Sequence, residues 1–166
     1  SQNRKPRVLV LGTGIAGLST ALKFAGSKDQ ECEVTLICKG RADEGATRWA
    51  QGGIAAVWSK DDSFEEHVRD TLNAGADLCH EDIVRICVEE GPERVRELIQ
   101  QGVEFTRVSP TSADFDLHRE GGHGQRRILH ADDLTGLAIE KALIAQIARH
   151  PRIRLLENYS AIDLIT

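Results

Sequence analysis

Glycines at positions 12, 14 and 17 form the pattern in this sequence most suited to binding a ligand. Gly12 lets the chain reverse tightly, Gly14 has no Cβ to hold a phosphate away from the backbone, and Gly17 lets the next helix approach the preceding strand. Free N–H groups and the positive dipole end at the start of that helix favour a pyrophosphate. The predicted dinucleotide-binding turn comprises Gly12, Thr13, Gly14, Ile15, Ala16 and Gly17.

The glycine turn has the sequence context of a dinucleotide-binding unit. Val8–Leu11 before it is an unbroken apolar run, which predicts a strand buried on both faces of a parallel sheet. A helical pattern follows as far as Gly26, and a second strand is predicted over Glu33–Cys38. Lys39 then stands where NAD-binding domains often carry an acid for the ribose hydroxyls. Since a lysine cannot accept those hydrogen bonds, Lys39 either approaches a phosphate or a ring carbonyl, or is a solvated strand end.

The order of the elements predicts an α/β fold of the Rossmann type with a parallel sheet. A strand, a helix, a second strand, a long insertion over about residues 40–129 and a long helix precede a third strand at Ile153–Leu156. The insertion is far longer than a usual crossover. Ala161–Ile165 is predicted to open a further strand. Because a doubly wound dinucleotide-binding fold needs more than three parallel strands, we expect residues 1–166 to be a fragment of a longer protein, with an incomplete sheet.

The insertion has helical and strand patterns of its own. Ser63 is the predicted cap of a helix with apolar residues at four-residue spacing. A second helix is predicted over residues 81–101, with a break near Pro92. Short strands are predicted over residues 54–58 and 103–105.

Composition and charge exclude several classes of protein. The formal net charge of −5 gives no reason to expect nucleic acid as a partner. No apolar run approaches the length that spans a bilayer, and the first residues, SQNRKP, lack the apolar segment of a signal peptide. We therefore expect no membrane partner. The cysteines form no Cys-x-x-Cys pair, so we expect reduced core thiols in a cytoplasmic protein, with a disulfide or metal role as the alternative. These cysteines are Cys32, Cys38, Cys79 and Cys87.

A polar, glycine-punctuated loop over residues 40–53 is the second stretch suited to binding a ligand. Its segment Thr47–Gly53, TRWAQGG, resembles the flavin-binding loop of the superfamily of succinate dehydrogenase, fumarate reductase and L-aspartate oxidase. Glycines and small residues let a backbone lie against a flat ring and present N–H groups to its edge. The alternative is an ordinary glycine-rich surface loop. Beyond the glycine turn, the predicted cofactor-binding residues are Lys39, Ala46, Thr47, Arg48, Trp49, Ala50, Gln51, Gly52 and Gly53.

The stretch Glu120–Gly136 narrows this resemblance. It reads EGGHGQRRILHADDLTG, and together with GGIAAV and DTLNAGADLC it is similar to the L-aspartate oxidases over essentially the whole chain. The resemblance implies that residues 1–166 are the N-terminal part of an FAD-binding domain. It also implies FAD as cofactor and oxidation of L-aspartate to iminosuccinate, with oxygen or fumarate as acceptor. That reaction is the first step of de novo NAD biosynthesis toward quinolinate, which implies a functional link to quinolinate synthase. The alternatives are a soluble fumarate reductase or succinate oxidase-type flavoprotein, and a non-catalytic nucleotide-binding fragment.

Ala46 predicts that the flavin dissociates from the protein. Succinate dehydrogenases and quinol-coupled fumarate reductases carry a histidine just before the threonine of this loop, and that histidine bonds covalently to the ring. This chain has Ala46 there, so we expect non-covalent FAD. Aspartate oxidases often have serine at this place, so the departure costs at most one side-chain hydrogen bond, about 1 kcal/mol.

Glu120 is the predicted catalytic residue. Aspartate differs from succinate by an ammonium group on the carbon that loses hydride, and a carboxylate is the natural partner of that cation. A matching glutamate in the L-aspartate oxidases is thought to orient the amino acid, so the resemblance gives that role to Glu120. Alternatively, Glu120 pairs on the surface with Arg119, Arg126 or Arg127. The family's arginine base and its carboxylate-binding residues lie beyond residue 166, so we expect the isolated chain to be inactive.

Three histidines, His118, His123 and His130, lie near Glu120 in the sequence. Imidazole is a common metal ligand, but their spacing matches no established ligand pattern. The glycines and arginines around them suit an anion or a flavin edge better. We therefore predict no metal site, and expect His123 or His130 to be a histidine of the core.

Overall fold

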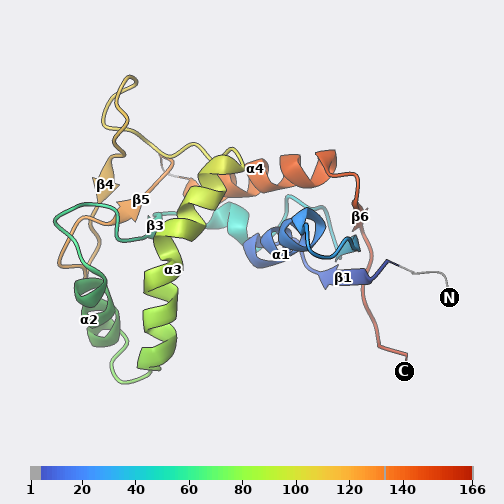
Figure 1. Cartoon of the computed structure of the whole chain (residues 1–166), viewed down its shortest axis with the longest axis horizontal. Coiled ribbons are helices and arrows are strands. Elements are labelled where there is room, and N and C mark those ends of the chain that lie inside the picture. The colour runs from blue at the N-terminus through green and yellow to red at the C-terminus, as the bar shows by residue number, and fades with distance from the viewer. Residues whose placement is uncertain (1–4, 133, 166) are drawn as a thin grey trace. The chain divides into compact units, whose positions relative to one another are not determined.

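The computed structural model describes residues 5–132 and 134–165 (Figure 1). The chain divides into two compact units, which we name by their content. The sheet unit comprises Ser1–Ala50 and Gly136–Thr166, and the insertion unit comprises Gln51–Thr135.

The sheet unit contains three parallel strands. These are β1 (Arg7–Leu11), β2 (Glu33–Cys38) and β6 (Ile153–Glu157), in the order β1-β2-β6. Their register places Val10 beside Leu36, and Leu36 beside Leu155. The predicted Rossmann-like α/β fold, with a long insertion between its second and third parallel strands, is confirmed.

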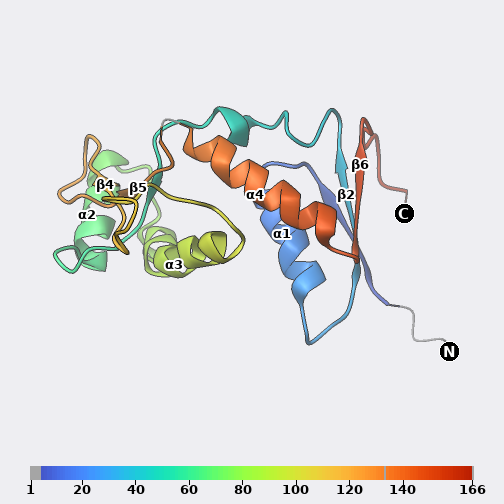
Figure 2. The same cartoon turned by 90° about the horizontal axis from the view of Figure 1, so that it is seen from above.

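Helices α1 (Ile15–Gly26) and α4 (Thr135–Arg149) lie on the same side of this sheet (Figure 2). Small residues on α1 let it approach the strands closely, and Ala21 and Ala25 are fully buried there. The side chains of Val34 and Leu36 on β2 are buried as well. The core of the sheet unit therefore lies between β2 and the helices.

The prediction that the first strand is buried on both faces is wrong. Val10 is buried, but Leu9 and Leu11 are 52% and 57% exposed. Side chains alternate between the two faces of a strand, and α1 and α4 lie on one side of the sheet (Figure 2). Val10 points to that side, since a Cβ on Gly17 of α1 would lie 3.6 Å from its Cγ1. Within the described residues no helix covers the face that carries Leu9 and Leu11.

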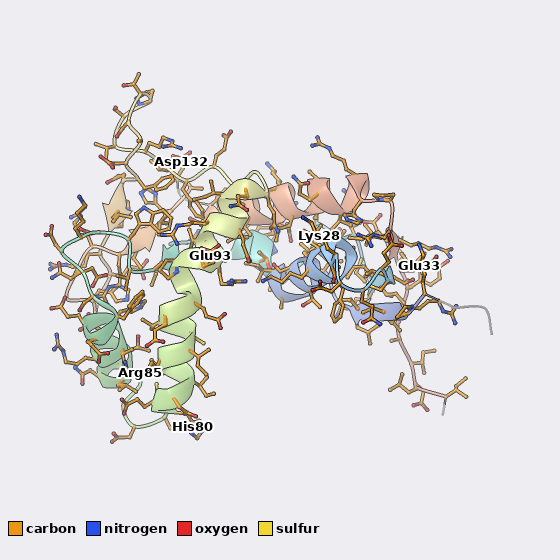
Figure 3. The ribbon with its side chains drawn as sticks, in the orientation of Figure 1. Lys28, Glu33, His80, Arg85, Glu93 and Asp132 are labelled. Carbon is orange, nitrogen blue, oxygen red and sulfur yellow. The ribbon has the colours of Figure 1, made fainter. Side chains whose placement is uncertain are left out.

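The insertion unit combines a small sheet with two helices. Strands β3 (Ile54–Ala55), β5 (Ile128–Leu129) and β4 (Leu117–His118) pair antiparallel in that order. Helices α2 (Phe64–Ala74) and α3 (Glu81–Gln100) precede β4 in the chain. Figure 3 shows Arg85 of α3 directed toward α2, where its guanidinium forms an ion pair with a glutamate, Glu65, at 2.5 Å.

The predicted cap of α2 is confirmed, whereas the predicted break in α3 is wrong. The Ser63 hydroxyl accepts a hydrogen bond from the Glu66 amide at 3.2 Å. Helix α3 continues through Pro92, although proline removes one backbone hydrogen bond. Burial of Pro92 with Val88 and Val95 on one face of α3 offsets that loss.

Two predicted strands and one predicted core thiol are also corrected. Residues 103–105 form no strand: the Val103 amide donates to the Leu98 carbonyl at the end of α3, and Val103 and Phe105 are buried. Residues 161–165 form no strand either, since no described strand pairs with them. Cys87 lies exposed on α3 rather than in the core. No helix in the described part of the chain is both long and apolar enough to cross a bilayer.

Candidate functional site

The glycine turn between β1 and α1 has a geometry that side chains would obstruct. Gly12 has a φ of +102°, a region that favours glycine, and its amide donates to the Ile37 carbonyl at 2.8 Å. A Cβ on Gly17 would lie 2.0 Å from the Gly12 carbonyl oxygen. Gly14 caps α1 without a side-chain hydrogen bond of its own, so amides of the first helical turn lack a capping partner from this residue.

A cavity of about 450 Å³ opens beside this turn, at the carboxyl ends of β1, β2 and β6. Ligands of open α/β sheets bind at this edge, and the volume lies within the range of small-molecule sites. Lys39 lines the cavity and forms no ion pair with a described residue, so its ammonium is available to a ligand. Burial raises the pKa of the Cys38 thiol, which donates to the Gly40 carbonyl at 3.2 Å.

Several residues that line this cavity were not predicted. Arg41 and Glu44 follow β2, and Tyr159, Ser160 and Ala161 follow β6. The rule that ligands bind beyond the carboxyl ends of parallel strands would have pointed to the segment after β6. The sequence interpretation instead began a further strand at Ala161 and made no assignment for Tyr159 and Ser160.

The sequence predicted an irregular loop over residues 40–53, but the structure contains one helical turn there. Ala46–Trp49 form one 3-10 turn, η1. The Thr47 hydroxyl accepts a hydrogen bond from the Ile15 amide at 3.0 Å, so η1 lies against the first residue of α1. Trp49 is 74% exposed, and Ala46 is exposed as well. The structure therefore brings the predicted residues of η1 to the glycine turn.

Gly136 at the start of α4 holds the other side of η1. A Cβ on Gly136 would lie 1.9 Å from the Thr47 carbonyl oxygen, and the Gly136 amide donates to the Ala50 carbonyl at 3.0 Å. Arg48 donates to the Asp43 carbonyl at 3.2 Å, within the same loop. The turn thus has a defined position between α1 and α4, which suits a loop that must present its backbone to a flat ring.

The remaining predicted cofactor residues, Gln51–Gly53, belong to the insertion unit. Gly53 lies against β5, since its Cβ would be 2.2 Å from the Leu129 carbonyl oxygen. Gly52 has a φ of +74°, and its carbonyl accepts a hydrogen bond from the Thr135 hydroxyl at 2.5 Å. The backbone of this glycine pair is therefore held from two sides.

Glu120 meets the loop at Gly52. A Cβ built on Gly52 would lie 2.9 Å from Glu120 Oε1, so the carboxylate lies directly over that glycine. Glu120 forms no ion pair with any residue that the structure describes. Arg126 donates instead to the Leu117 carbonyl at 2.8 Å, and Arg127 is fully buried. The carboxylate is consequently free to accept hydrogen bonds from a ligand.

Arg127 is the centre of a buried ion network that sequence reasoning missed. Its guanidinium bonds Asp62 through two nitrogens at 2.8 and 2.9 Å, and Asp70 at 2.9 Å. Asp70 also accepts the Gly124 amide at 2.7 Å, and this bond, with the Arg127 charge, holds the pKa of the Asp70 carboxyl below its usual range. The network therefore fixes the end of the turn that begins at Glu120. Asp62 and Arg127 lie 65 positions apart in the sequence, so no local pattern predicts that they form an ion pair.

The histidines are divided between two places. His118 and His130 stack with ring centroids 3.7 Å apart, and Asp116 Oδ2 lies 3.4 and 3.6 Å from their Nε2 atoms. These three residues are close enough to suggest a metal site. However, nitrogen lone pairs lie in the ring planes, and two planes only 23° apart do not converge well on one ion. His123 lies apart, edge-on to His67, whose pKa is lowered by burial and by the Arg127 charge.

A model of the FAD binding domain matches residues 7–166. The chain belongs to the FAD binding domain family. This FAD binding domain is 47% identical to the L-aspartate oxidase of Pseudomonas aeruginosa over 171 residues, which cover 100% of the chain and 31% of that protein. It is 49% identical to the L-aspartate oxidase of Vibrio cholerae over 162 residues, which cover 96% of the chain and 30% of that protein. The chain therefore spans about a third of the length of these curated relatives.

Solved structures share the fold of this FAD binding domain. The FrdA chain of an E. coli quinol fumarate reductase, in mutant form, superimposes with a TM-score of 0.85 at 30% sequence identity. The match covers 93% of this chain and 26% of that one.

FAD is the cofactor of this domain, and the residues of the sheet unit fit it. The turn at residues 12–17 offers backbone amides and contains no acidic side chain that would repel a pyrophosphate. The space at Gly12 is open, with nothing within 4 Å of an added Cβ. Lys39 lines the cavity beside the turn and has no ion-pair partner among the described residues, so its positive charge suits the negative charge of a pyrophosphate.

Proposed function

We propose that this domain is part of an FAD-dependent L-aspartate oxidase that converts L-aspartate to iminosuccinate with oxygen or fumarate as acceptor. The observation that carries the proposal is the Glu120 carboxylate, which lies over Gly52 without a cationic partner among the described residues. The 47% and 49% identity to two L-aspartate oxidases supports the same choice of substrate. The role in NAD biosynthesis, the link to quinolinate synthase and a cytoplasmic location follow from this proposal and stay predictions.

In this proposal the sheet unit binds the nucleotide part of FAD. The amides of Gly14 and its neighbours bind the pyrophosphate, and Lys39 approaches a phosphate or a ring carbonyl. Residues 46–53 present their backbone to the ring system. When bound, FAD supplies the acceptor for the hydride that leaves the substrate. Ala46 has no atom able to bond covalently to a flavin, so the cofactor is held by non-covalent contacts alone.

Glu120 has the role of orienting the substrate. Its carboxylate accepts hydrogen bonds from the substrate ammonium group, a charge-assisted contact that fixes which carbon faces the ring. A substrate without the ammonium group, such as succinate, leaves this carboxylate without a partner. Glu120 therefore favours aspartate over succinate by a contact that succinate cannot make.

The test compares two substrates in a full-length enzyme that carries these residues. Glu120→Gln is expected to lower kcat/KM for L-aspartate by about tenfold to a hundredfold, the value of one or two lost charge-assisted bonds, and to change fumarate reduction much less. Arg119→Gln, an exposed neighbour, is the control and is expected to change neither. Equal losses for both substrates in Glu120→Gln would contradict the role of Glu120.

The second candidate function is that of a soluble fumarate reductase-type flavoprotein. The superposition on FrdA at a TM-score of 0.85 favours it. Turnover of succinate together with no turnover of L-aspartate would select this alternative.

A further inference from the structure

Glu140 on α4 is a fully buried carboxyl group that the proposed function does not use. Its exposed fraction is 0%, and neither carboxyl oxygen has a hydrogen bond of good geometry to a described residue, although the Gly45 amide lies close enough to act on the carboxyl. A buried carboxylate without partners is strongly disfavoured, so such a group takes up a proton and becomes neutral. The position of Glu140 within the sheet unit gives this a functional consequence.

The carboxyl group lies next to the predicted pyrophosphate site. A Cβ built on Gly45 would be 3.3 Å from Glu140 Oε1, 3.7 Å from the Thr13 carbonyl oxygen and 3.9 Å from Gly14 Cα. All three groups therefore lie within 4 Å of one point beside Gly45. Gly45 in turn is the residue that leads into η1, so Glu140 contacts the point where η1 and the glycine turn meet.

The charges around Glu140 do not titrate in the neutral range. Arg48 and Asp43, both in the loop before η1 or within it, are the charged groups that act on the carboxyl. A guanidinium stays protonated at all ordinary pH values, and Arg41 lowers the pKa of Asp43 further into the acid range. The glycine turn contributes no charged side chain. Burial raises the pKa of Glu140 in spite of the Arg48 charge and the Gly45 amide, which act in the opposite direction.

We propose that Glu140 is a positioning residue for FAD, which holds the junction of η1 and the glycine turn as a neutral acid and weakens FAD binding when it ionises. The inference rests on the placement of the FAD pyrophosphate at Gly12–Gly17 under the proposed function. An anionic Glu140 faces the same turn as the anionic pyrophosphate, and the buried site screens the repulsion poorly. The neutral form leaves the turn free of that repulsion.

Because of thermodynamic linkage, this effect can be measured either as a change in FAD affinity with pH or as a change in the pKa of Glu140 when FAD binds. If the neutral acid favours FAD, then FAD must favour the neutral acid and raise the pKa of Glu140. A rise of about one pKa unit corresponds to about tenfold tighter binding of FAD to the neutral form. A side chain that only fills space in the core shows no such coupling.

The first test measures the FAD dissociation constant of the chain by quenching of flavin fluorescence at about pH 5 and about pH 9, which bracket the range of buried glutamates. The natural chain is expected to lose about tenfold in affinity at the higher pH, and Glu140→Gln to lose much less. Glu33→Gln removes an exposed carboxylate at the start of β2, labelled in Figure 3, and is expected to follow the natural chain. An equal loss in Glu140→Gln, or none in the natural chain, would overturn the inference. Absence of FAD binding at both pH values would instead overturn the pyrophosphate placement, and this inference with it.

The second test needs no variant. Carboxyl ¹³C NMR of the natural chain is expected to show Glu140 titrating above the ordinary range of glutamate, and higher still when FAD is bound. An ordinary titration that FAD leaves unchanged would refute the role of Glu140.

Discussion

The Thr47 hydroxyl accepts a hydrogen bond from the Ile15 amide at 3.0 Å. Ile15 is the first residue of α1 and Thr47 belongs to η1, so one bond joins the two stretches predicted to bind the cofactor. A Cβ on Gly14 would lie 3.7 Å from the same hydroxyl, which is ordinary contact distance. The Thr47 side chain therefore links η1 directly to the start of α1.

Replacement of Thr47 by valine tests this link. Thr47→Val keeps the shape of the side chain and removes the acceptor, and the exposed Ile15 amide can still bond to water. We expect a loss of about 1 kcal/mol or less in the free energy of unfolding, and a clear fall in FAD affinity because η1 is no longer held to α1. Thr47→Ser keeps the hydroxyl and is the matched control. Unchanged FAD binding in Thr47→Val, measured by fluorescence quenching, would show that the bond does not position the loop.

Gly14 allows the pyrophosphate site to be blocked without disturbing the fold. Its φ of −68° and ψ of 173° suit any residue, and an added Cβ meets nothing closer than 3.7 Å. Gly14→Ala is therefore expected to fold normally and to bind FAD at least about tenfold more weakly, since the methyl group holds the phosphates away from the amides. Gly26→Ala adds a methyl group in open space at the end of α1 and is expected to leave binding unchanged. Equal affinities of the two variants would contradict the placement of the pyrophosphate.

Asp70 makes the free energy of unfolding of the chain depend on pH. The Gly124 amide and Arg127 lower the pKa of Asp70 in the folded state, so the carboxylate stabilises the fold above its unfolded pKa and loses that effect as the pH falls through its folded pKa. Asp70→Asn is expected to lower the free energy of unfolding by about 2 kcal/mol near pH 7, and by progressively less as the pH falls below the ordinary range of aspartate and through the folded pKa of Asp70. Urea denaturation at neutral pH and along an acid series measures the difference, with exposed Asp77→Asn as the control. A loss in Asp70→Asn that stays the same along the series would contradict the assignment.

The sequence predicted those elements whose pattern is local. The apolar run at Glu33–Cys38 has the bounds of β2, and the Ser63 cap marks the start of α2. The local sequence patterns gave wrong predictions where contacts between distant residues determine the structure. Pro92 remains helical because its neighbours on α3 are buried, and Leu9 is exposed because helices cover only the other face of the sheet.

The candidate site was predicted to a similar extent. The glycine turn and the loop after β2 were identified because glycines are needed where the backbone turns sharply or approaches another chain segment. Three features were not found: the segment after β6, the Arg127 network and buried Glu140. The Arg127 network and the burial of Glu140 depend on residues far apart in the chain, and such contacts leave no periodicity in the sequence. The segment after β6 was missed because a strand was predicted from residue 161, although the position of ligands at strand ends pointed to it.

The visible absorbance spectrum of the purified chain with added FAD, before and after acid precipitation, tests the central claim most directly. The account predicts flavin bands in the folded protein that move entirely to the supernatant on precipitation, because residues 12–17 and 46–53 bind FAD and Ala46 cannot bond to it covalently. Flavin that stays with the precipitated protein would contradict non-covalent binding. A chain that takes up no FAD would contradict the site itself.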